Sequence, residues 1–419
     1  MDATAKVLRC LRDRTILITG STGFLAKLLV EKILRVQPDV KRLYLLVRAP
    51  DDAAAEQRVL HEVVGKEVFD VLREKHGADF HSFIKEKTTA LAGDIIHQNL
   101  GLGNAQAKQL FEEIDIIISG AATTTFNERY DVALAINTFG TVHICQFAKQ
   151  CAHLKLLLHI STGVAGNGED RLILEKPLQM GQALKKGRCL DIGAELELTN
   201  KVKETLITER SGIVSSQQLE KVAMKELGFK RAKYFGWPNV YTFTKAMGEM
   251  LLGTMTGDFA LVIVRPSIIT STFQDPFPGW IEGIRTIDVL IAATYEQKLP
   301  CFITGRIIDS IPGDMVVNAT IVAMATHYDD VRTQAIYNVT SALQNPLPCN
   351  VLDESTHAYC LINPHVTDHK SFDDTNMRKL WGSMGAGRGD DGYIFNFDPS
   401  SINWRLYLFN THIPAVLKS

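Results

Sequence analysis

The sequence lacks any run of about 18 consecutive apolar residues, the length that a membrane-crossing helix needs. Arg and Asp interrupt the first twenty residues before an apolar core can form, so this stretch does not resemble a secretory signal. The seven cysteines are scattered and contain no CxxC pair, which favours reduced thiols and argues against a structural zinc site. We therefore expect a cytosol-facing protein with no signal peptide, no transmembrane segment and no bound metal.

An excess of charge of either sign is also absent. Lys plus Arg number 45 and Asp plus Glu number 47, which gives a formal net charge of -2. This balance provides no general attraction to nucleic acid, and we predict no nucleic-acid partner. Hydrophobic residues make up 46% and charged residues 22% of the 419 residues, as in a folded globular protein of one or two domains.

Strand-like and helix-like patterns alternate through the first 165 residues. Short apolar runs typical of buried parallel strands occupy Thr15–Thr19, Arg42–Val47, Thr88–Ala92, Ile114–Ser119 and Lys155–Ile160. Helical spacing is clearest in Phe24–Val36 and Tyr130–Cys151. The alternation predicts an α/β fold of the Rossmann type, with a doubly wound parallel sheet.

The remaining sequence suggests three regions. Residues 1–275 are predicted to form the dinucleotide-binding domain, with a charged helical insertion at about 168–235 that is too long for an ordinary connection. Proline and glycine become frequent at about residue 276, so we place the change of domain there. Residues 276–345 are expected to bind substrate and residues 346–419 to form a smaller, α-rich C-terminal domain.

A glycine-rich turn follows the first predicted strand. Gly20, Gly23 and Ala26 form a GxxGxxA pattern that opens the Phe24–Val36 helix. Small residues there let the backbone approach a pyrophosphate at the helix N-terminus. The alternative is a structural turn that binds no ligand. The placement between strand and helix favours a dinucleotide site.

The end of the second predicted strand indicates which dinucleotide binds. NAD sites usually carry Asp or Glu there, whereas this chain has Arg48, whose guanidinium suits the 2′-phosphate of NADPH. The alternative for Arg48 is a solvated surface charge. Asp94 is expected to meet the adenine, and the small Ala121 and Ala122 to let the cofactor cross the sheet edge. The full predicted NADPH set is Gly20, Thr22, Gly23, Phe24, Leu25, Arg48, Asp94, Ile95, Ala121, Ala122, Lys245 and Pro266.

Tyr241 and Lys245 lie four residues apart, so on a helix they share one face. The Lys245 ammonium is expected to lower the pKa of the phenol, which would let Tyr241 exchange a proton with a carbonyl or alcohol oxygen. One hydroxyl of Ser161-Thr162, after the fifth strand, would donate a hydrogen bond to the same oxygen; we favour Thr162, and Ser161 could instead cap the strand. Asn137 is predicted either to hold a relay water or to bridge helices.

Several phrases together resemble the extended short-chain dehydrogenase/reductase superfamily, and more closely the plant-like alcohol-forming fatty acyl-CoA reductases of the "male sterility" type. They are GSTGFLA, AATTTFNERYDVALAINTFGT, HISTG, YTFTKAMGE, IPGDMVVNA, AIYNVTSALQNPL and SINWRLYLFNTHIP. The resemblance implies reduction of a long-chain fatty acyl-CoA by two NADPH to a primary alcohol, with release of CoA and a retained aldehyde. It also implies a role in lipid synthesis and peripheral attachment to the endoplasmic reticulum; no oligomeric state is predicted.

The sequence departs from that family at three places. Ala26 stands where the family usually has Gly, and Gly163-Val164-Ala165 stands where it typically has Ala-Tyr-Val. The C-terminal domain looks shortened between about Pro346 and Phe372. Two alternatives therefore stay open: a reductase that stops at the aldehyde, and an NADP-binding paralogue with impaired catalysis. An apolar acyl channel is expected from Phe277–Trp280 and Ile281–Ala292, which ordinary core packing would explain equally well.

Overall fold

A seven-stranded parallel sheet forms the centre of the protein. The computed structural model describes residues 3–163, 172–208, 216–255, 257–284, 287–296, 301–304, 307–348, 359–362, 371–385 and 394–418. The sheet has the order β12-β7-β5-β4-β1-β2-β3. Its strands are β1 (Thr15–Thr19), β2 (Arg42–Val47), β3 (Thr88–Ala92), β4 (Ile116–Ser119), β5 (Leu156–Ile160), β7 (Ala260–Pro266) and β12 (Gln334–Val339). The strand order reverses between β1 and β4, which creates the crevice where doubly wound sheets bind ligands.

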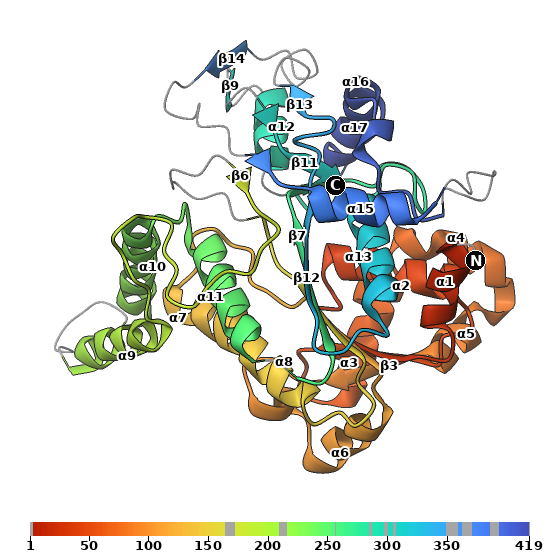
Figure 1. Ribbon diagram of the computed structural model, residues 1–419, viewed down its shortest axis with the longest axis horizontal. Helices are drawn as coiled ribbons and strands as arrows, with labels where there is room; N and C mark the ends of the chain where they lie inside the picture. The colour runs from red at the N-terminus through yellow and green to blue at the C-terminus, as the bar shows by residue number, and fades with distance from the viewer. Residues whose placement is uncertain are drawn as a thin grey trace.

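Helices cover both faces of this sheet (Figure 1). One face carries α1 (Ala3–Leu11), α2 (Phe24–Val36) and α13 (Gly313–His327); the other carries α6 (Asn104–Glu113), α8 (Gly140–Ala148) and α11 (Val240–Thr254). Alternate residues of β1 supply both cores: Ile16 and Ile18 join the first, and Leu17 joins the second. Strands buried on both faces account for the continuous apolar runs in the sequence, and the predicted fold class is confirmed.

The element boundaries follow local capping. β1, β2, β3 and α2 span the predicted residues. β4 begins two residues later than expected, because Ile114 ends α6 and the Asp115 carboxylate accepts a hydrogen bond of 2.8 Å from the Thr15 backbone N–H. The long helix predicted from Tyr130 is built from α7 (Tyr130–Ala133), a π-helical turn at Leu134–Phe139 and α8. Beside β2 and β3 lie α3 (Asp52–Arg58), α4 (Asp70–His76) and α5 (Phe80–Lys87).

The predicted insertion forms a helical lobe that projects to one side of the sheet (Figure 1). Its described helices are α9 (Ile192–Thr208) and α10 (Ser216–Phe235), which pack on α7 and α11. The Tyr130 hydroxyl donates a hydrogen bond of 2.8 Å to Glu195, and Glu195 also pairs with Arg231 of α10. These buried polar contacts fix the lobe to α7.

The sheet and its core continue past residues 275 and 276, where we expect the change of domain. β12 lies within the region assigned to substrate binding, yet it pairs in parallel with β7 from Gln334 opposite Leu261 to Val339 opposite Pro266. The C-terminal helices α15 (Thr375–Ser383), α16 (Trp404–Tyr407) and α17 (Ile413–Val416) share one core with α2 and α13. An apolar strand needs neighbours on both faces, so the sheet extends past the proline-rich segment and the described C-terminal helices pack onto it.

Short strand pairs surround the carboxyl edge of the sheet. β8 (Ile268–Thr270) pairs with β11 (Ser310–Pro312), and β6 (Leu172–Ile173) with β15 (Ser371–Phe372). β9 (Cys301–Thr304) pairs with β14 (Tyr359–Ile362), and β10 (Ile307–Ile308) with β13 (Leu347–Pro348). α12 (Ile287–Tyr295) contacts α17. Much of the segment between Pro346 and Phe372, where we expect the shortening, lies outside the described residues.

A buried ion pair joins α11 to β7. Glu249 and Arg265 are each 2% exposed, and their closest atoms, Arg265 Nη2 and Glu249 Oε2, are 2.6 Å apart. Arg265 also donates hydrogen bonds to the backbone carbonyls of Leu174 (3.2 Å) and Lys176 (3.1 Å), which lie at the start of the insertion. This single side chain therefore connects the sheet, α11 and the insertion.

Removing one partner of this pair leaves the other charge buried and unpaired. We expect Arg265→Met and Glu249→Gln each to lower the free energy of unfolding by about 3–5 kcal/mol. The double variant should lose clearly less free energy of unfolding than the two single variants lose together, because neither charge then remains buried alone. Urea unfolding of the four proteins measures this, and strictly additive losses would contradict the interpretation.

Candidate active site

The glycine turn lies at the crevice between β1 and β4. Gly20 has φ +73°, and a Cβ there would lie 2.7 Å from the Ala121 backbone nitrogen, so only glycine fits. The Ser21 hydroxyl turns inward and donates a hydrogen bond of 2.9 Å to the Ile18 carbonyl. Gly23 is the N-cap residue of α2 and has no side chain to cover the positive end of that 13-residue helix. The residues present thus fit a dinucleotide pyrophosphate.

Other predicted cofactor residues follow the same edge of the sheet. Arg48 is exposed just after β2, and Thr22, Ala121 and Ala122 are half-buried. Asp94 is half-buried and accepts a hydrogen bond of 3.1 Å from the Ile96 backbone N–H. Their placement agrees with a cofactor lying across β1–β4, and their role as ligands stays a prediction.

Four members of the predicted cofactor set are packed into the protein. Ile95 is turned away from the edge: its side chain occupies the space above Gly140 of α8. The Phe24 ring stacks on Trp280 with centroids 5.0 Å apart, and Leu25 packs against the same core. The Pro266 carbonyl accepts a hydrogen bond of 2.8 Å from Gly163. The side chains of Ile95 and Phe24 are thus part of the packing, and only the backbone of these two residues is left to contact a cofactor.

The expected acyl channel is also partly core. Trp280, Ile287 and Ile291 are buried in the core that contains α2 and α13, whereas Ile284 and Val289 are exposed. The ordinary-core interpretation therefore holds for at least these three side chains.

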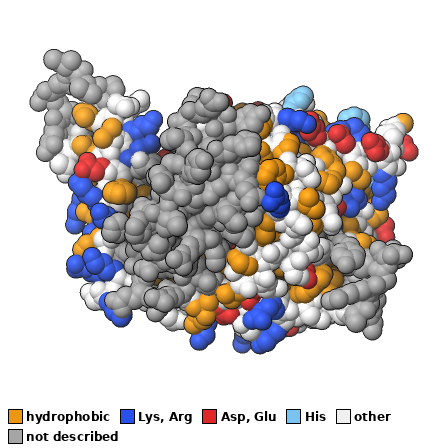
Figure 2. Space-filling view, turned by 90° about the horizontal axis from the view of Figure 1, so that it is seen from above, with side chains coloured by type: hydrophobic (Ala, Val, Ile, Leu, Met, Phe, Trp, Pro, Cys, Tyr) orange, Lys and Arg blue, Asp and Glu red, His pale blue; other side chains and the backbone are white. Residues whose placement is uncertain are grey.

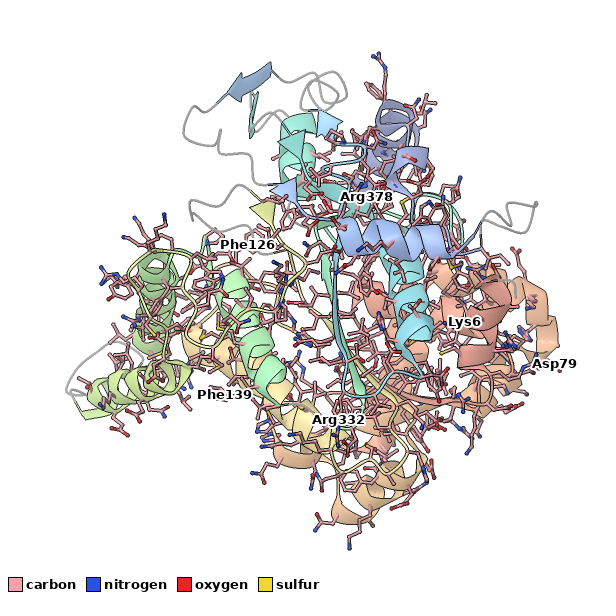
Figure 3. All side chains as sticks on the ribbon, viewed as in Figure 1. Lys6, Asp79, Phe126, Phe139, Arg332 and Arg378 are labelled. Atoms are coloured by element: carbon pink, nitrogen blue, oxygen red, sulfur yellow. The ribbon has the colours of Figure 1, made fainter. Side chains whose placement is uncertain are left out.

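Tyr241 lies in the first turn of α11. The Asn239 side chain caps this helix by accepting a hydrogen bond of 2.9 Å from Thr242 N–H, which fixes where the helix begins. The Thr162 side chain lies close enough to the phenol to lower its pKa. Phe126, 49% exposed, stacks over the ring with centroids 6.2 Å apart, and Figure 3 shows it at the N-terminal end of α11. Tyr241 and Thr162 can thus address one substrate oxygen.

Burial raises the pKa of the Tyr241 phenol above its usual value, and the nearby Thr162 side chain offsets this in part. This direction differs from the lowering that we expected from Lys245. The cause is that the buried phenol loses hydration and the ammonium is anchored to β5 instead. A phenol that keeps its proton at neutral pH is in the form needed to protonate an alkoxide.

Lys245 is 1% exposed and held beneath the helix. Its ammonium donates a hydrogen bond of 2.7 Å to the Ile160 carbonyl and lies 3.0 Å from Nε2 of His159. Burial lowers the pKa of Lys245 to about 8, and the Glu249 carboxylate on the next turn counteracts this. The ammonium is therefore charged at neutral pH but close to losing its proton.

The structure separates the two hydroxyls after β5. Ser161 is buried and donates its hydroxyl to the Glu249 carboxylate, so it faces the ion pair. Thr162 is half-buried and meets Tyr241. This arrangement favours Thr162 as the substrate-facing group and gives Ser161 a structural contact.

Asn137 uses its amide to bridge segments. Its oxygen accepts a hydrogen bond of 3.0 Å from Thr123 N–H. Its nitrogen donates to the Thr123 carbonyl at 3.1 Å and to the Thr244 hydroxyl at 3.0 Å. Both amide hydrogens are thus committed, which matches the bridging alternative and leaves no donor for a relay water.

Sequence reasoning missed three polar residues behind the site: His159, Glu249 and Arg265. One signal was available, since His159 is the only polar side chain in the buried run LLLHI of β5. Among the described residues, no group of three His, Cys, Asp or Glu side chains is arranged to hold a metal ion.

The reversed-order parallel sheet, the glycine turn and the Tyr241–Lys245 helix together define a nicotinamide-dependent reductase of the Rossmann type. Comparison with known proteins agrees. Residues 18–320 match the profile of an NAD-binding domain family described as "Male sterility protein". The terminal R domain of a myxalamid biosynthetic pathway has a similar fold, with a TM-score of 0.61 and 17% identity over 97% of this chain and 96% of that one.

This chain belongs to the male sterility family of reductases. An "Alcohol-forming fatty acyl-CoA reductase" from Simmondsia chinensis is 46% identical over 375 residues, which cover 88% of this chain and 75% of that protein. "Fatty acyl-CoA reductase 1" from Arabidopsis thaliana is 40% identical over 97% of both proteins. That alignment has 484 positions against the 419 residues of this chain, so the relative carries additional internal sequence.

Proposed function

We propose that this protein reduces long-chain fatty acyl-CoA to a primary alcohol with two NADPH, releasing CoA through a retained aldehyde. The observation that carries the proposal is the Thr162–Tyr241 pair above the buried Lys245, at the sheet edge that holds the glycine turn. Binding of a dinucleotide alone does not need this set. The relatives named as fatty acyl-CoA reductases support the substrate class.

The residues have a consistent role in both reductions. A bound reduced nicotinamide supplies one hydride in each round. Thr162 and Tyr241 donate hydrogen bonds to the thioester oxygen and later to the aldehyde oxygen, stabilising the negative charge that develops there. In the first round the tetrahedral adduct collapses and the CoA thiolate leaves; in the second, Tyr241 gives its proton to the alkoxide. Solvent then returns a proton to the Tyr241 phenolate.

The reaction is tested by incubating the protein with NADPH and acyl-CoAs of graded chain length and identifying the lipid products. We expect alcohol to dominate when NADPH is in excess. Tyr241→Phe should lower kcat by about 10²–10⁴-fold, because it removes the acid while keeping the ring. Cofactor affinity, measured by NADPH fluorescence, should be retained.

The exposed tyrosine of α10 provides a matched control, because Tyr234→Phe should leave turnover unchanged. Accumulated aldehyde would favour the reductase that stops at that stage. A wild-type protein that binds NADPH but turns over no acyl-CoA would instead support the impaired paralogue.

We propose NADPH as the cofactor because Arg48 is exposed at the end of β2, free of any acidic neighbour at positions 47–50. Arg48→Glu should weaken NADPH binding by about ten- to a hundredfold, since a charge-assisted contact to the 2′-phosphate is lost and a repulsion is added. NADH binding should change little. Lys41→Ala, at the other end of β2, is the control; equal losses for both cofactors would refute a 2′-phosphate contact.

We further propose peripheral attachment to the endoplasmic reticulum through α10. Leu219, Val222 and Phe229 are each 52–53% exposed and lie on one face of this helix with Lys230 and Lys233. Figure 2 shows basic side chains gathered at the end of the molecule formed by the insertion. Exposed apolar side chains flanked by lysines suit an anionic lipid surface. None of the described helices is long and apolar enough to span a bilayer.

Co-sedimentation with vesicles that contain anionic lipid tests this surface. The double change Val222→Ser and Phe229→Ser should reduce the bound fraction several-fold, because it removes two apolar side chains from the interface. Val331→Ser, at an exposed apolar residue near the amino end of β12, should bind as the wild type does. Equal binding of all three proteins would rule out α10 as the docking surface.

A further inference from the structure

His159 is placed in an unusual position for a polar side chain. It is the fourth residue of β5, is 0% exposed and follows three leucines. Ser119 of β4 is its cross-strand neighbour in the parallel register, and their side chains are 3.0 Å apart at Nδ1. On the other side of the ring, Nε2 lies 3.0 Å from the Lys245 ammonium. A buried imidazole with a partner on each nitrogen is a fixed part of a polar network.

The protonation state of this ring follows from its neighbours. Burial lowers the pKa of His159 well below its usual value, and the charge of Lys245 lowers it further, so the imidazole is neutral. An ammonium can only donate, so Nε2 must accept the hydrogen bond from Lys245. The proton of the ring then resides on Nδ1 and is donated to the Ser119 hydroxyl. Lys245 thereby selects the tautomer, and the Ser119 hydroxyl stabilises it by accepting the hydrogen bond from Nδ1.

The ammonium of Lys245 has three N–H bonds. One is directed to Nε2 of His159 and one to the Ile160 carbonyl. Among its contacts with the described residues, this leaves one N–H for the side where Tyr241 and the cofactor ribose are expected. Two acceptors from consecutive residues of β5 therefore set both the position of the charge and the direction of its remaining donor.

We infer that His159 is a positioning residue for the reaction, which keeps Lys245 protonated and directed at the active site, with Ser119 accepting the hydrogen bond from its Nδ1. The inference rests on the proposed reductase function. His159 acts through Lys245 and touches neither substrate nor cofactor. Its lone pair offsets part of the hydration that the ammonium loses on burial.

Other charged groups near Lys245 do not replace this contact. On its own helix, Glu249 favours the ammonium, but Glu249 is already engaged by Arg265 of β7 and by Ser161. From β5 the facing titratable group is His159, and at the start of the helix it is Tyr241. The π-helical turn at Leu134–Phe139 packs against this part of α11, and its contacting side chains, Asn137 and Thr138, carry no charge.

The pH dependence of kcat tests the inference. Because burial lowers the pKa of Lys245 to about 8, the wild-type rate should fall as the pH rises through about 8. His159→Asn keeps a group that can reach Ser119 but removes the acceptor at Nε2, so the charged form of Lys245 becomes less favourable. We expect the pH at which kcat falls to be lower by about one unit, with kcat at pH 8 reduced by about fivefold.

His159→Gln places an amide oxygen near the position of Nε2 and should restore much of the rate and of the wild-type profile. His143→Asn, on α8, is the matched control, because that ring contacts the Ile95 carbonyl instead of Lys245. Thermal melts of all variants show whether they are folded. If His159→Asn does not fold, Ser119→Ala takes its place and should lower the pH at which kcat falls by a smaller amount.

If the wild type is active and His159→Asn has the wild-type pH profile, the inference is overturned. A His159→Gln variant whose kcat is no higher than that of His159→Asn would overturn it as well. A wild type without turnover would instead refute the proposed function, so the two failures are distinguishable.

Discussion

Burying charged side chains beneath α11 is the constraint on which the rest of the structure depends. Lys245 and Glu249 lie one turn apart on the face that packs against the sheet, where neither can reach bulk water. Each therefore needs partners from the strands: Lys245 takes His159 and the Ile160 carbonyl, and Glu249 takes Arg265. Because an unpaired buried charge costs several kcal/mol, α11 has one depth and rotation at which all these contacts form.

That orientation sets the chemistry. With Lys245 anchored to the end of β5, the first turn of α11 brings Tyr241 to Thr162, which immediately follows the buried Ser161. The same sheet edge carries the glycine turn, because the strand order reverses between β1 and β4. A cofactor held at Gly20 and a substrate oxygen held by Tyr241 then share one crevice. The fold brings the cofactor site and the substrate site into one crevice, and the buried polar network fixes the orientation of α11 beside it.

The C-terminal half is part of this arrangement. β12 completes the sheet beside β7, and Trp404 and Tyr407 pack into the same core as α2. Phe372 of β15 comes to the end of β5, where a Cβ on Gly163 would lie 3.0 Å from its ring. The small residue at 163 is thus matched by an aromatic side chain from far along the chain. A chain with less internal sequence than its relatives still covers the sheet in this way.

Local patterns in the sequence determined the strands, α2, the glycine turn and the Tyr241–Lys245 spacing, because periodicity and turn chemistry depend on near neighbours. Tertiary structure alone decided what depends on distant contacts. It placed β12 in the first sheet, turned Ser161 toward Glu249, committed Asn137 to a bridge and set His159 against Lys245. Such pairings join residues up to 107 positions apart, and burial, which shifted the pKa of Tyr241 upward, is a property of the packed molecule rather than of any segment.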